Sequence, residues 1–454
     1  MDNSTACGQL HSLWTRQPVD KAGCDRGWAQ PVRSLAVKVL VIGGGGREHA
    51  LCRAIAQDPQ VDALVCAPGN AGIAGVAELR PVDQIDPAAV ADLAAEVAAD
   101  LVVIGPEAPL VAGVADAVRA RGIACFGPSR EAARLEGSKA FAKEVMAAAD
   151  VPTARAYVCT TEQEAAEALD AFGPPYVVKD DGLAAGKGVV VTEDREQALA
   201  HARACGRVVI EEYLDGPEVS LFAVTDGETV VPLQPAQDFK RVGDGDTGPN
   251  TGGMGAYSPL PWAPPDLVDD VVRTIVQPTV DEMRRRGTPF QGLLYAGLAL
   301  TSRGPRVVEF NCRFGDPETQ VVLARLRTPL AGLLQAAATG RLADAEPLRW
   351  NPGAAVTVVM ASEGYPAKPR TGDVIEGLDE AAEVEGAYVL HAGTRRDEQG
   401  RVMTAGGRVL NVTATAPTLR AARDRAYEAV GKIRFTGAHY RRDIAHRAIE
   451  ADQG

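Results

Sequence analysis

The sequence lacks the features that mark membrane, secreted and zinc-binding proteins. No apolar run reaches the roughly 18 residues that a membrane-spanning helix needs. The eight cysteines are scattered and no two form a C-x-x-C pair, so we expect neither a disulfide framework nor a zinc site. Scattered reduced thiols are typical of a cytosolic chain, and we therefore expect a cytoplasmic protein without a membrane partner.

Basic charge is also in deficit. The chain has 47 Lys and Arg against 60 Asp and Glu, a formal net charge of −13. Nucleic-acid binding needs a basic face, so we expect no nucleic-acid partner. Small phosphate ligands are not excluded, because individual loops bind them.

A length of 454 residues predicts about three domains of roughly 150 residues each. Residues 1–35 are polar and aperiodic without a signal-peptide core, which predicts a disordered extension or a start site placed too early; a short packed arm is the alternative. Strands then alternate with helices as far as Phe126, which is typical of a parallel, doubly wound sheet. The rhythm changes after Pro128, and a strand-rich third unit begins at Ala354.

A glycine-rich turn follows the first apolar strand, Val37 to Ile42. Gly43 to Gly46 precede a helical pattern, and a helix N-terminus behind such a turn suits a phosphate. The third glycine of a dinucleotide fingerprint is missing, since Glu48 stands there, and no acidic residue follows the second strand at 67–70. These absences weigh against an NAD-dependent oxidoreductase. A turn needed only for packing is the alternative.

A second glycine loop begins where the strand ending at Lys179 stops, and it runs from Asp181 to Gly188. A lysine held on a strand beside such a loop can reach triphosphate oxygens, and the loop N–H groups can fold over them. Another strand follows, so this is not the Walker pattern. A plain hairpin loop with solvated lysines is the alternative.

Acidic residues at 211–218 form the third candidate. After the strand that ends near Glu211, the backbone of Tyr213 and Leu214 can meet an adenine edge, and Glu218 can hold ribose hydroxyls. An ordinary acidic strand end fits this segment as well.

The fourth candidate is the run from Glu309 to Glu318. On a strand, Glu309, Asn311 and Arg313 share one face, while Phe310 and Cys312 point into the core. A carboxylate and an amide oxygen suit Mg²⁺, and an arginine beyond them can neutralise a transferring phosphoryl group. A half-buried strand with polar residues on its wet face is the alternative.

Residues 237–257 are rich in glycine and polar residues and have no period, so we expect a structureless functional loop. Arg241 suits a carboxylate and Asp238 suits an ammonium, which together fit a small zwitterion. A mobile surface loop is the alternative.

Taken together, these motifs resemble the phosphoribosylamine–glycine ligase family over residues 37 to about 450. The runs that carry the resemblance are GGGGREHA at 43–50, APGNAG at 67–72, IGPEAPL at 104–110, LEGSKAF at 135–141, DGLAAGKGV at 181–189, RVGDGDTGPNTGGMGAYSP at 241–259, EFNCRFGDPETQ at 309–320 and RTGDVI at 370–375.

The resemblance implies a multidomain α/β and α+β fold. Its parts are a doubly wound N-terminal domain at 36–138, an ATP-grasp domain at 139–352 with a mobile lid at about 151–212, and a small α+β C-terminal domain at 353–454. It also implies three small-molecule partners, ATP, glycine and phosphoribosylamine, and a Mg²⁺ or Mn²⁺ cofactor. We expect a monomer or a small homo-oligomer.

The resemblance also implies the site residues. ATP is expected at Lys139, Lys179, Gly186, Lys187, Gly188, Glu211, Tyr213, Leu214 and Glu218, and the metal at Glu309 and Asn311. The other substrates are expected at Gly45, Gly46, Arg47, Glu107, Asn250, Gly252 and Gly253, and the catalytic groups are Arg313, Lys187, Asp238 and Arg241.

Two departures from the family pattern are visible. Asp180 stands where a small residue is expected, and Phe239 stands where a polar ring is common. The ATP-grasp pattern also often supplies a third, acidic metal ligand from the preceding strand. Here that strand, at 294–298, has no acidic residue, so only two protein ligands are assigned to the metal.

The implied reaction activates glycine as glycyl phosphate, which the phosphoribosylamine nitrogen then attacks. A non-catalytic nucleotide-binding regulator and an ATP-grasp ligase with another acceptor are the rival functions.

Overall fold

The computed structural model describes residues 36–183 and 188–451. The predicted extension at 1–35 therefore lies outside the described residues, as do Gly186 and Lys187 of the second glycine loop. In the described ranges, no helix is both long enough and apolar enough to cross a membrane.

The first part of the chain folds into a five-stranded parallel sheet, as its alternating pattern predicts. The sheet order is β3-β2-β1-β4-β5, formed by β1 (Val37–Gly43), β2 (Val61–Pro68), β3 (Glu78–Leu79), β4 (Leu101–Ile104) and β5 (Ala124–Phe126). The chain reverses its direction of winding between β1 and β4. In open parallel sheets this switch point is where ligands bind, beyond the carboxyl ends of the strands. Gly43 and Gly105 stand there.

The helices of this part are α1 (Gly46–Ala56), α2 (Pro87–Glu96), α3 (Glu107–Ala112) and α4 (Val114–Ala120). The sequence predicts a single helix from Leu110 to Arg121, and this is wrong. Gly113 has φ +93°, a left-handed conformation that ends α3 and starts α4.

The middle of the chain forms two antiparallel sheets. One has the order β11-β10-β16-β17, from β10 (Glu218–Asp226), β11 (Val230–Pro232), β16 (Gln291–Thr301) and β17 (Gly304–Asn311). The other has the order β6-β9-β7-β8, from β6 (Ala156–Cys159), β7 (Tyr176–Asp180), β8 (Val189–Thr192) and β9 (Val208–Glu211). This second sheet packs with α7 (Glu162–Phe172) and α8 (Arg195–Cys205) around a core of its own that includes Leu169, Val178, Leu199 and Ile210.

The sequence also predicts one helix from Arg130 to Ala149 and another from Pro265 to Arg286, and both are divided. Ser138 has an extended backbone between α5 (Arg134–Gly137) and α6 (Lys139–Ala148), and its hydroxyl accepts from the Phe141 N–H at 3.2 Å as an N-cap. The segment predicted at 265–286 consists of α9 (Leu267–Val271), a π-helical turn (Val272–Val276) and α10 (Gln277–Arg285).

The segment at 237–257 is not structureless, which corrects the expectation from its composition. It contains β12 (Gln237–Asp238), β13 (Arg241–Gly243), β14 (Thr247–Asn250) and β15 (Gly255–Ser258). β15 pairs antiparallel with β18 (Ala354–Ala361), so the segment completes a sheet of order β12-β15-β18-β22-β19 with the C-terminal strands β22 (Arg408–Ala416) and β19 (Ala387–His391). Backbone pairing with a distant strand, not an apolar period, holds it in place.

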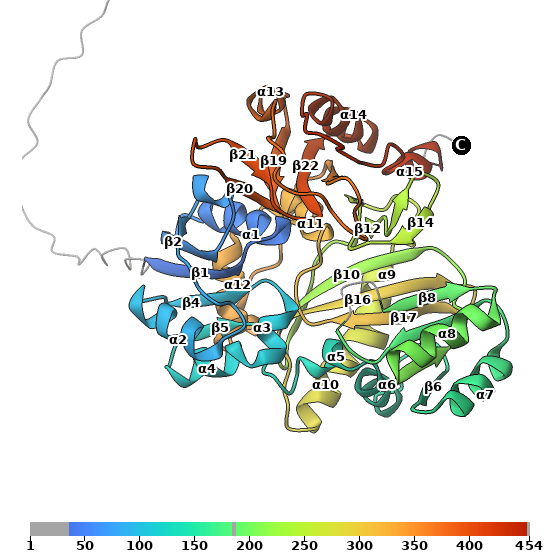
Figure 1. Ribbon diagram of the computed structural model, residues 1–454. Coiled ribbons are helices and arrows are strands. Elements are labelled where there is room, and N and C mark those ends of the chain that lie inside the picture. Colours follow the sequence, from blue (N-terminus) through green and yellow to red (C-terminus); the bar gives the residue numbers. More distant parts are fainter. Residues whose placement is uncertain (1–35, 184–187, 452–454) are drawn as a thin grey trace, which may run out of the picture. The chain divides into compact units, whose positions relative to one another are not determined.

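Two helices, α11 (Glu318–Arg325) and α12 (Leu330–Ala338), precede the third unit of the sequence. Within that unit lie α13 (Leu378–Ala382), β20 (Thr394–Arg396), β21 (Val402–Thr404), α14 (Leu419–Val430) and α15 (His446–Ala451). One hydrophobic core includes Leu40, Leu294 and Val356, which lie in three different sheets. Figure 1 shows the C-terminal strands beside α1 and α11, where the chain's three sections meet.

Two buried histidines join β19 to α1. The backbone N–H of His391 donates to Nδ1 of His49 at 2.8 Å, and the side chain of Asn70 donates to the His391 carbonyl at 2.8 Å. Burial lowers the pKa of His49 to about 3 and that of His391 to about 4. Both rings are therefore neutral at neutral pH.

Because of these two histidines, we expect the free energy of unfolding to fall in acid. Because their folded pKa values lie below the unfolded value, the unfolded chain binds more protons, and stability present above pH 6.5 is lost as the pH falls towards 4. Each group should contribute about 1 kcal/mol to the loss between pH 7 and 5.5. In urea unfolding at the two pH values, His391→Gln should reduce that loss, whereas His446→Gln, at an exposed ring, should not. An unchanged loss in His391→Gln would contradict the assignment.

Candidate functional site

The first glycine turn encloses a protein side chain. The Glu48 carboxylate accepts from the Gly45 N–H at 2.6 Å and from Arg47 Nε at 2.6 Å. A Cβ added at Gly43 would lie 2.5 Å from Glu48 Cγ, and one at Gly105 would lie 2.1 Å from its Oε1. These glycines make room for Glu48, which sequence reasoning identifies only as the residue in place of a glycine. The spacing of a capping box, with Glu48 three residues after the N-cap, is the signal that could have identified its role.

Gly46 marks a tight contact between α1 and the C-terminal sheet. A Cβ there would lie 2.2 Å from Nδ2 of the buried Asn411 on β22 and 2.9 Å from Nε2 of Gln320 on α11. Any larger residue at 46 would force these elements apart, so the glycine is required for close packing at this point.

Asp316 links three distant segments, a role that its membership of a sequence motif does not predict. Its Oδ2 accepts from the Arg47 N–H at 3.1 Å and its Oδ1 from Gln320 Nε2 at 2.9 Å, while Arg408 lies 3.5 Å from Oδ1 and donates to its carbonyl at 2.7 Å. Burial alone would raise the pKa of this carboxyl, but Arg408 and Arg47 lower it overall. The ionised Asp316 therefore ties α1 to β22.

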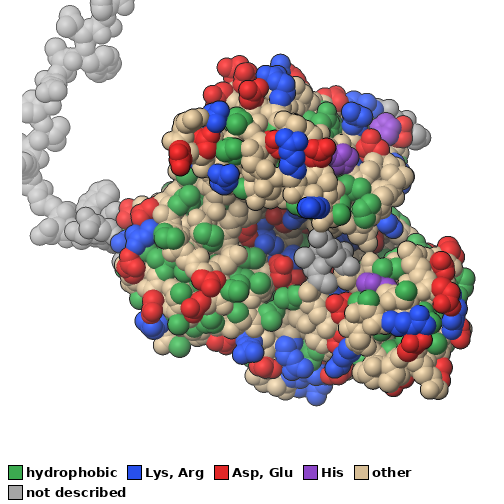
Figure 2. Space-filling model, in the orientation of Figure 1, with side chains coloured by type: hydrophobic (Ala, Val, Ile, Leu, Met, Phe, Trp, Pro, Cys, Tyr) green, Lys and Arg blue, Asp and Glu red, His purple; other side chains and the backbone are tan. Residues whose placement is uncertain are grey.

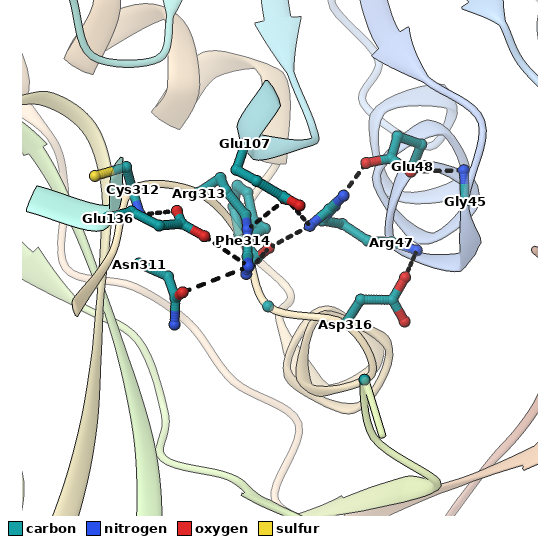
Figure 3. A network of polar contacts seen from close by, with 12 residues as sticks. Gly45, Arg47, Glu48, Glu107, Glu136, Asn311, Cys312, Arg313, Phe314 and Asp316 are labelled. Atoms are coloured by element: carbon teal, nitrogen blue, oxygen red, sulfur yellow. Dashed lines mark hydrogen bonds and ion pairs between the residues drawn. The ribbon is translucent and has the colours of Figure 1, made fainter. Parts of the chain in front are cut away.

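Arg313 lies at the centre of a polar network that Figure 3 shows in detail. Its Nε lies 3.2 Å from Glu107 Oε2 and its Nη2 lies 2.9 Å from Glu136 Oε1. The same Nη2 lies 3.5 Å from Asn311 Oδ1, and Arg47 Nη1 lies 4.0 Å from Glu107 Oε2. Burial opposes charge on the guanidinium, but Glu136 and Glu107 outweigh it and raise the pKa of Arg313. The network thus brings together Arg47, Glu107, Asn311 and Arg313, four of the predicted site residues.

The segment at 250–253 is held against the same junction. Arg408 donates to the Gly252 carbonyl at 2.7 Å, and the Gly252 N–H donates to the Tyr365 hydroxyl at 3.0 Å. Gly253 has φ +114°, and a Cβ there would lie 2.4 Å from Pro317 Cδ. Asn250 is half-buried at the end of β14, opposite Arg241.

Two lysines and one carboxylate form a second cluster, which joins the β6-β9-β7-β8 sheet to α6. Lys179 Nζ lies 2.8 Å from Glu211 Oε2 and donates to the Val308 carbonyl at 2.8 Å. Sequence reasoning missed Lys143, whose Nζ lies 3.0 Å from the other Glu211 oxygen. Lys179 and Lys143 outweigh the effect of burial and lower the pKa of Glu211.

Lys139 and Asp181 connect α6 to the second glycine loop. Lys139 Nζ donates to the Gly182 carbonyl at 2.9 Å. Asp181 Oδ1 accepts from the Ser138 hydroxyl at 3.1 Å and from the Ala140 N–H at 3.0 Å, so it caps the helix. Gly188, the first described residue after the loop, accepts from the Asp180 N–H at 2.8 Å. Of the predicted ATP residues after β9, Tyr213 is 52% exposed and Leu214 is half-buried.

Carboxylates outnumber cations beside β12. Glu218 is paired with Lys240, which lowers the pKa of Glu218. Burial, together with the nearby carboxylates of Glu318, Glu218 and Glu309, raises the pKa of Asp238 to about 7 against the opposing effect of Lys240. A surplus of acidic groups around a half-buried Asp238 favours a bound cation.

The residues expected to hold a metal fit that role. Glu309 and Asn311 are half-buried on β17, while Phe310 on the same strand and Cys312 directly after it are buried, as predicted. Their oxygens are the donors that hard divalent cations prefer, and two protein ligands leave positions for phosphate and water. In the described parts of the chain, no three His, Cys, Asp or Glu side chains form a group that could hold a metal by themselves.

Arg241 is a predicted catalytic residue that is half-buried. It lies on the β13–β14 ribbon, its Nη1 donates to the Gly248 carbonyl at 2.8 Å, and its own carbonyl accepts from Arg441 at 3.1 Å. Phe239, one of the departures from the family pattern, is half-buried beneath the Arg441 guanidinium. The Cζ atom of Arg441 lies 4.9 Å from the centre of the Phe239 ring. The face of the molecule drawn in Figure 2 has a hollow in which basic and acidic side chains lie together.

Comparison with protein-family models agrees with the motifs. The N domain of phosphoribosylglycinamide synthetase matches residues 37–136, its ATP-grasp (A) domain matches 137–319 and its C domain matches 355–447. A phosphoribosylamine–glycine ligase of Streptomyces coelicolor is 73% identical over 417 residues, covering 91% of this chain and 100% of that protein. One from Mycobacterium leprae is 60% identical over 423 residues, covering 91% and 99%.

Solved structures give the same result for the fold. The crystal structure of a phosphoribosylamine–glycine ligase from Thermotoga maritima has a TM-score of 0.79 and 35% identity, covering 90% of this chain and 100% of that one. A biotin carboxylase from Campylobacter jejuni, at 14% identity and a TM-score of 0.67, shares the fold alone. The match covers 90% of this chain and 94% of the biotin carboxylase chain. The chain therefore belongs to the phosphoribosylglycinamide synthetase family, the ATP-grasp phosphoribosylamine–glycine ligases.

Proposed function

We propose that the chain ligates glycine to 5-phosphoribosylamine through glycyl phosphate, giving glycinamide ribonucleotide, ADP and phosphate in the second step of purine biosynthesis. The glycine carboxylate attacks the γ-phosphorus of ATP and ADP leaves. The phosphoribosylamine nitrogen then attacks the acyl carbon, and phosphate leaves as the amide forms. No bond to the protein forms in either step.

One observation carries this proposal. The network from Arg47 through Glu107 and Arg313 to Asn311 joins the glycine turn at the switch point of the first sheet to the strand that carries the metal donors. A phosphorylated amine at the turn and a nucleotide at the strand would then lie on opposite sides of one arginine. That is the arrangement needed to pass an acyl phosphate to an amine without releasing it.

The ATP phosphates are assigned to the lysine cluster and the second glycine loop. Lys179 belongs to the cluster, and Lys139 contacts the start of the loop. Gly186, Lys187 and Gly188 of the loop are assigned to the phosphates as well. Glu211, the backbone at Tyr213 and Leu214, and Glu218 are assigned to adenine and ribose. Glu309 and Asn311 would hold Mg²⁺ or Mn²⁺, which neutralises phosphate charge when bound. Arg313 is positioned by two carboxylates to neutralise the phosphoryl group being transferred.

Glycine is assigned to the acidic surroundings of β12. The cation-favouring position at Asp238 suits the glycine ammonium, and Arg241, on the neighbouring ribbon, is assigned to its carboxylate. Phosphoribosylamine is assigned to Gly45, Gly46, Arg47 and Glu107, with Asn250, Gly252 and Gly253 closing the site from the opposite side. Enclosure of the acyl phosphate between these segments would keep water from it.

The domain limits that we propose are 36–138, 139–352 and 353–454, with a lid at about 151–212. The separate core of the β6-β9-β7-β8 sheet supports a lid that moves as a unit. We further propose that the chain acts in the cytoplasm, as a monomer or a small homo-oligomer, and binds neither nucleic acid nor membrane.

An ADP-release assay with each substrate omitted in turn tests the proposed function. ADP should form at a steady rate only when glycine and phosphoribosylamine are both present with a divalent metal. Glycine alone should give at most about one ADP per enzyme, because the acyl phosphate stays bound. Steady ADP release with glycine and a different amine at an equal kcat/KM would instead support an ATP-grasp ligase with another acceptor.

A further inference from the structure

Lys143 is a half-buried lysine that no part of the proposed mechanism uses. It lies on α6, and its ammonium has three partners: it is 3.0 Å from Glu211 Oε1, and it donates to Thr153 Oγ1 at 2.9 Å and to the Ala154 carbonyl at 2.8 Å. An ammonium has three protons to donate, so each of them is engaged. A lysine that is only solvated would not be held in this way.

The partners of Lys143 stand at both crossings between the proposed lid and the rest of the chain. Thr153 and Ala154 precede β6, where the chain enters the lid, and Glu211 ends β9, where the chain leaves it. The Thr153 hydroxyl also donates to the Val307 carbonyl at 2.7 Å, on the strand that carries Glu309 and Asn311. Lys143 therefore fixes both crossings relative to the metal-binding strand.

Lys143 also shares one carboxylate with Lys179. Each oxygen of Glu211 faces one ammonium, and the side chains of Lys143, Lys179 and Glu211 are only 13%, 5% and 4% exposed. Two ammonium groups on one carboxylate leave a net charge of +1, and burial keeps solvent from screening it. Without Lys143, Lys179 and Glu211 would form a neutral pair.

We propose that Lys143 is a positioning residue for ATP. It pairs with one oxygen of the Glu211 carboxylate, so that this carboxylate does not fully neutralise Lys179, and Lys179 keeps a positive charge available for the nucleotide phosphates. This rests on the proposed role of Lys179 in ATP binding. Lys143 itself touches no substrate. Its effect should therefore depend on the β- and γ-phosphates and not on the adenosine part of the nucleotide.

Calorimetric binding of Mg-ATP and of AMP to the full chain tests the proposal. Lys143→Met should raise the Kd of ATP about tenfold, which is a loss of about 1.4 kcal/mol, while the Kd of AMP changes less than twofold. Lys143→Arg, which keeps the charge, should restore most of the ATP affinity. Arg195→Met is the matched control, because Arg195 pairs with Asp170 inside the lid and away from both crossings; it should change neither Kd.

The outcomes separate this proposal from the one on which it rests. If Lys143→Met weakens the binding of ATP and of AMP equally, or weakens the binding of neither, the positioning role is wrong. If Lys179→Met leaves ATP binding unchanged, the proposed role of Lys179 is wrong whatever Lys143 does. If Lys143→Met does not fold, Lys143→Gln keeps a hydrogen-bond donor without the charge, and the same selective loss of ATP affinity is expected from it.

Discussion

Replacing Arg313 with methionine should lower kcat about 10²–10³-fold, the usual cost of removing one preorganised group that stabilises transition-state charge. The same change should lower the free energy of unfolding by about 3–5 kcal/mol, because it leaves Glu107 and Glu136 facing each other without their shared guanidinium. Burial already raises the pKa of Glu136 and Arg313 opposes that rise, so the variant should take up a proton at this site. Steady-state kinetics and urea unfolding measure the two effects.

Two further variants isolate the contribution of the guanidinium geometry. Arg313→Lys keeps the charge, but a single ammonium cannot span both carboxylates, so stability should recover more than kcat does. Arg303→Met removes an exposed arginine in the turn just before β17, 3.4 Å from Glu212, and should change neither quantity much. A kcat for Arg313→Met within threefold of the native value would show that Arg313 has only a structural role.

Replacing Glu309 with alanine should lower kcat by at least about 10²-fold, the order expected when a charged metal ligand worth several kcal/mol is lost. Stability should not fall with it, because Glu309 is one of the carboxylates that raise the pKa of Asp238, and removing it relieves that repulsion. Asn311→Ala, which removes a neutral ligand, should cost less, and excess Mg²⁺ or Mn²⁺ should partly restore its rate. Metal titrations of kcat and thermal melts measure these effects.

The control for this pair is Glu162→Ala, which removes an exposed carboxylate paired with Arg203 on the lid and should leave the metal dependence unchanged. Native rates in both Glu309→Ala and Asn311→Ala would mean that the metal is held by other residues. A melting temperature that falls sharply in Glu309→Ala would mean that this side chain has a structural partner.

The sequence was most informative where a function follows from local geometry. Strand alternation alone predicts that Glu309, Asn311 and Arg313 share one face with Phe310 and Cys312 behind them, and the burial of these residues agrees. The parallel order of the first sheet follows in the same way from alternating strands and helices. Such predictions need no knowledge of which residues meet across the fold.

The sequence failed where the partner of a residue is far away along the chain. Asp316 is held by Arg47, 269 residues earlier, and by Arg408, and nothing near residue 316 indicates either. Lys143 depends on Glu211 in the same way. β15 was missed because its small and polar residues are ordered by backbone pairing with β18, about 100 residues later, and not by an apolar period.

Transfer of oxygen from glycine to phosphate tests the proposed reaction most directly. When glycine carries ¹⁸O in both carboxylate positions, glycyl phosphate formation places one of these atoms between carbon and phosphorus, and the amine's attack on carbon leaves it on phosphorus. Mass spectrometry of the released phosphate should therefore find one ¹⁸O per phosphate and one in the amide product. Phosphate without label, formed together with glycinamide ribonucleotide, would contradict the acyl phosphate and the roles assigned to Arg313 and the metal donors.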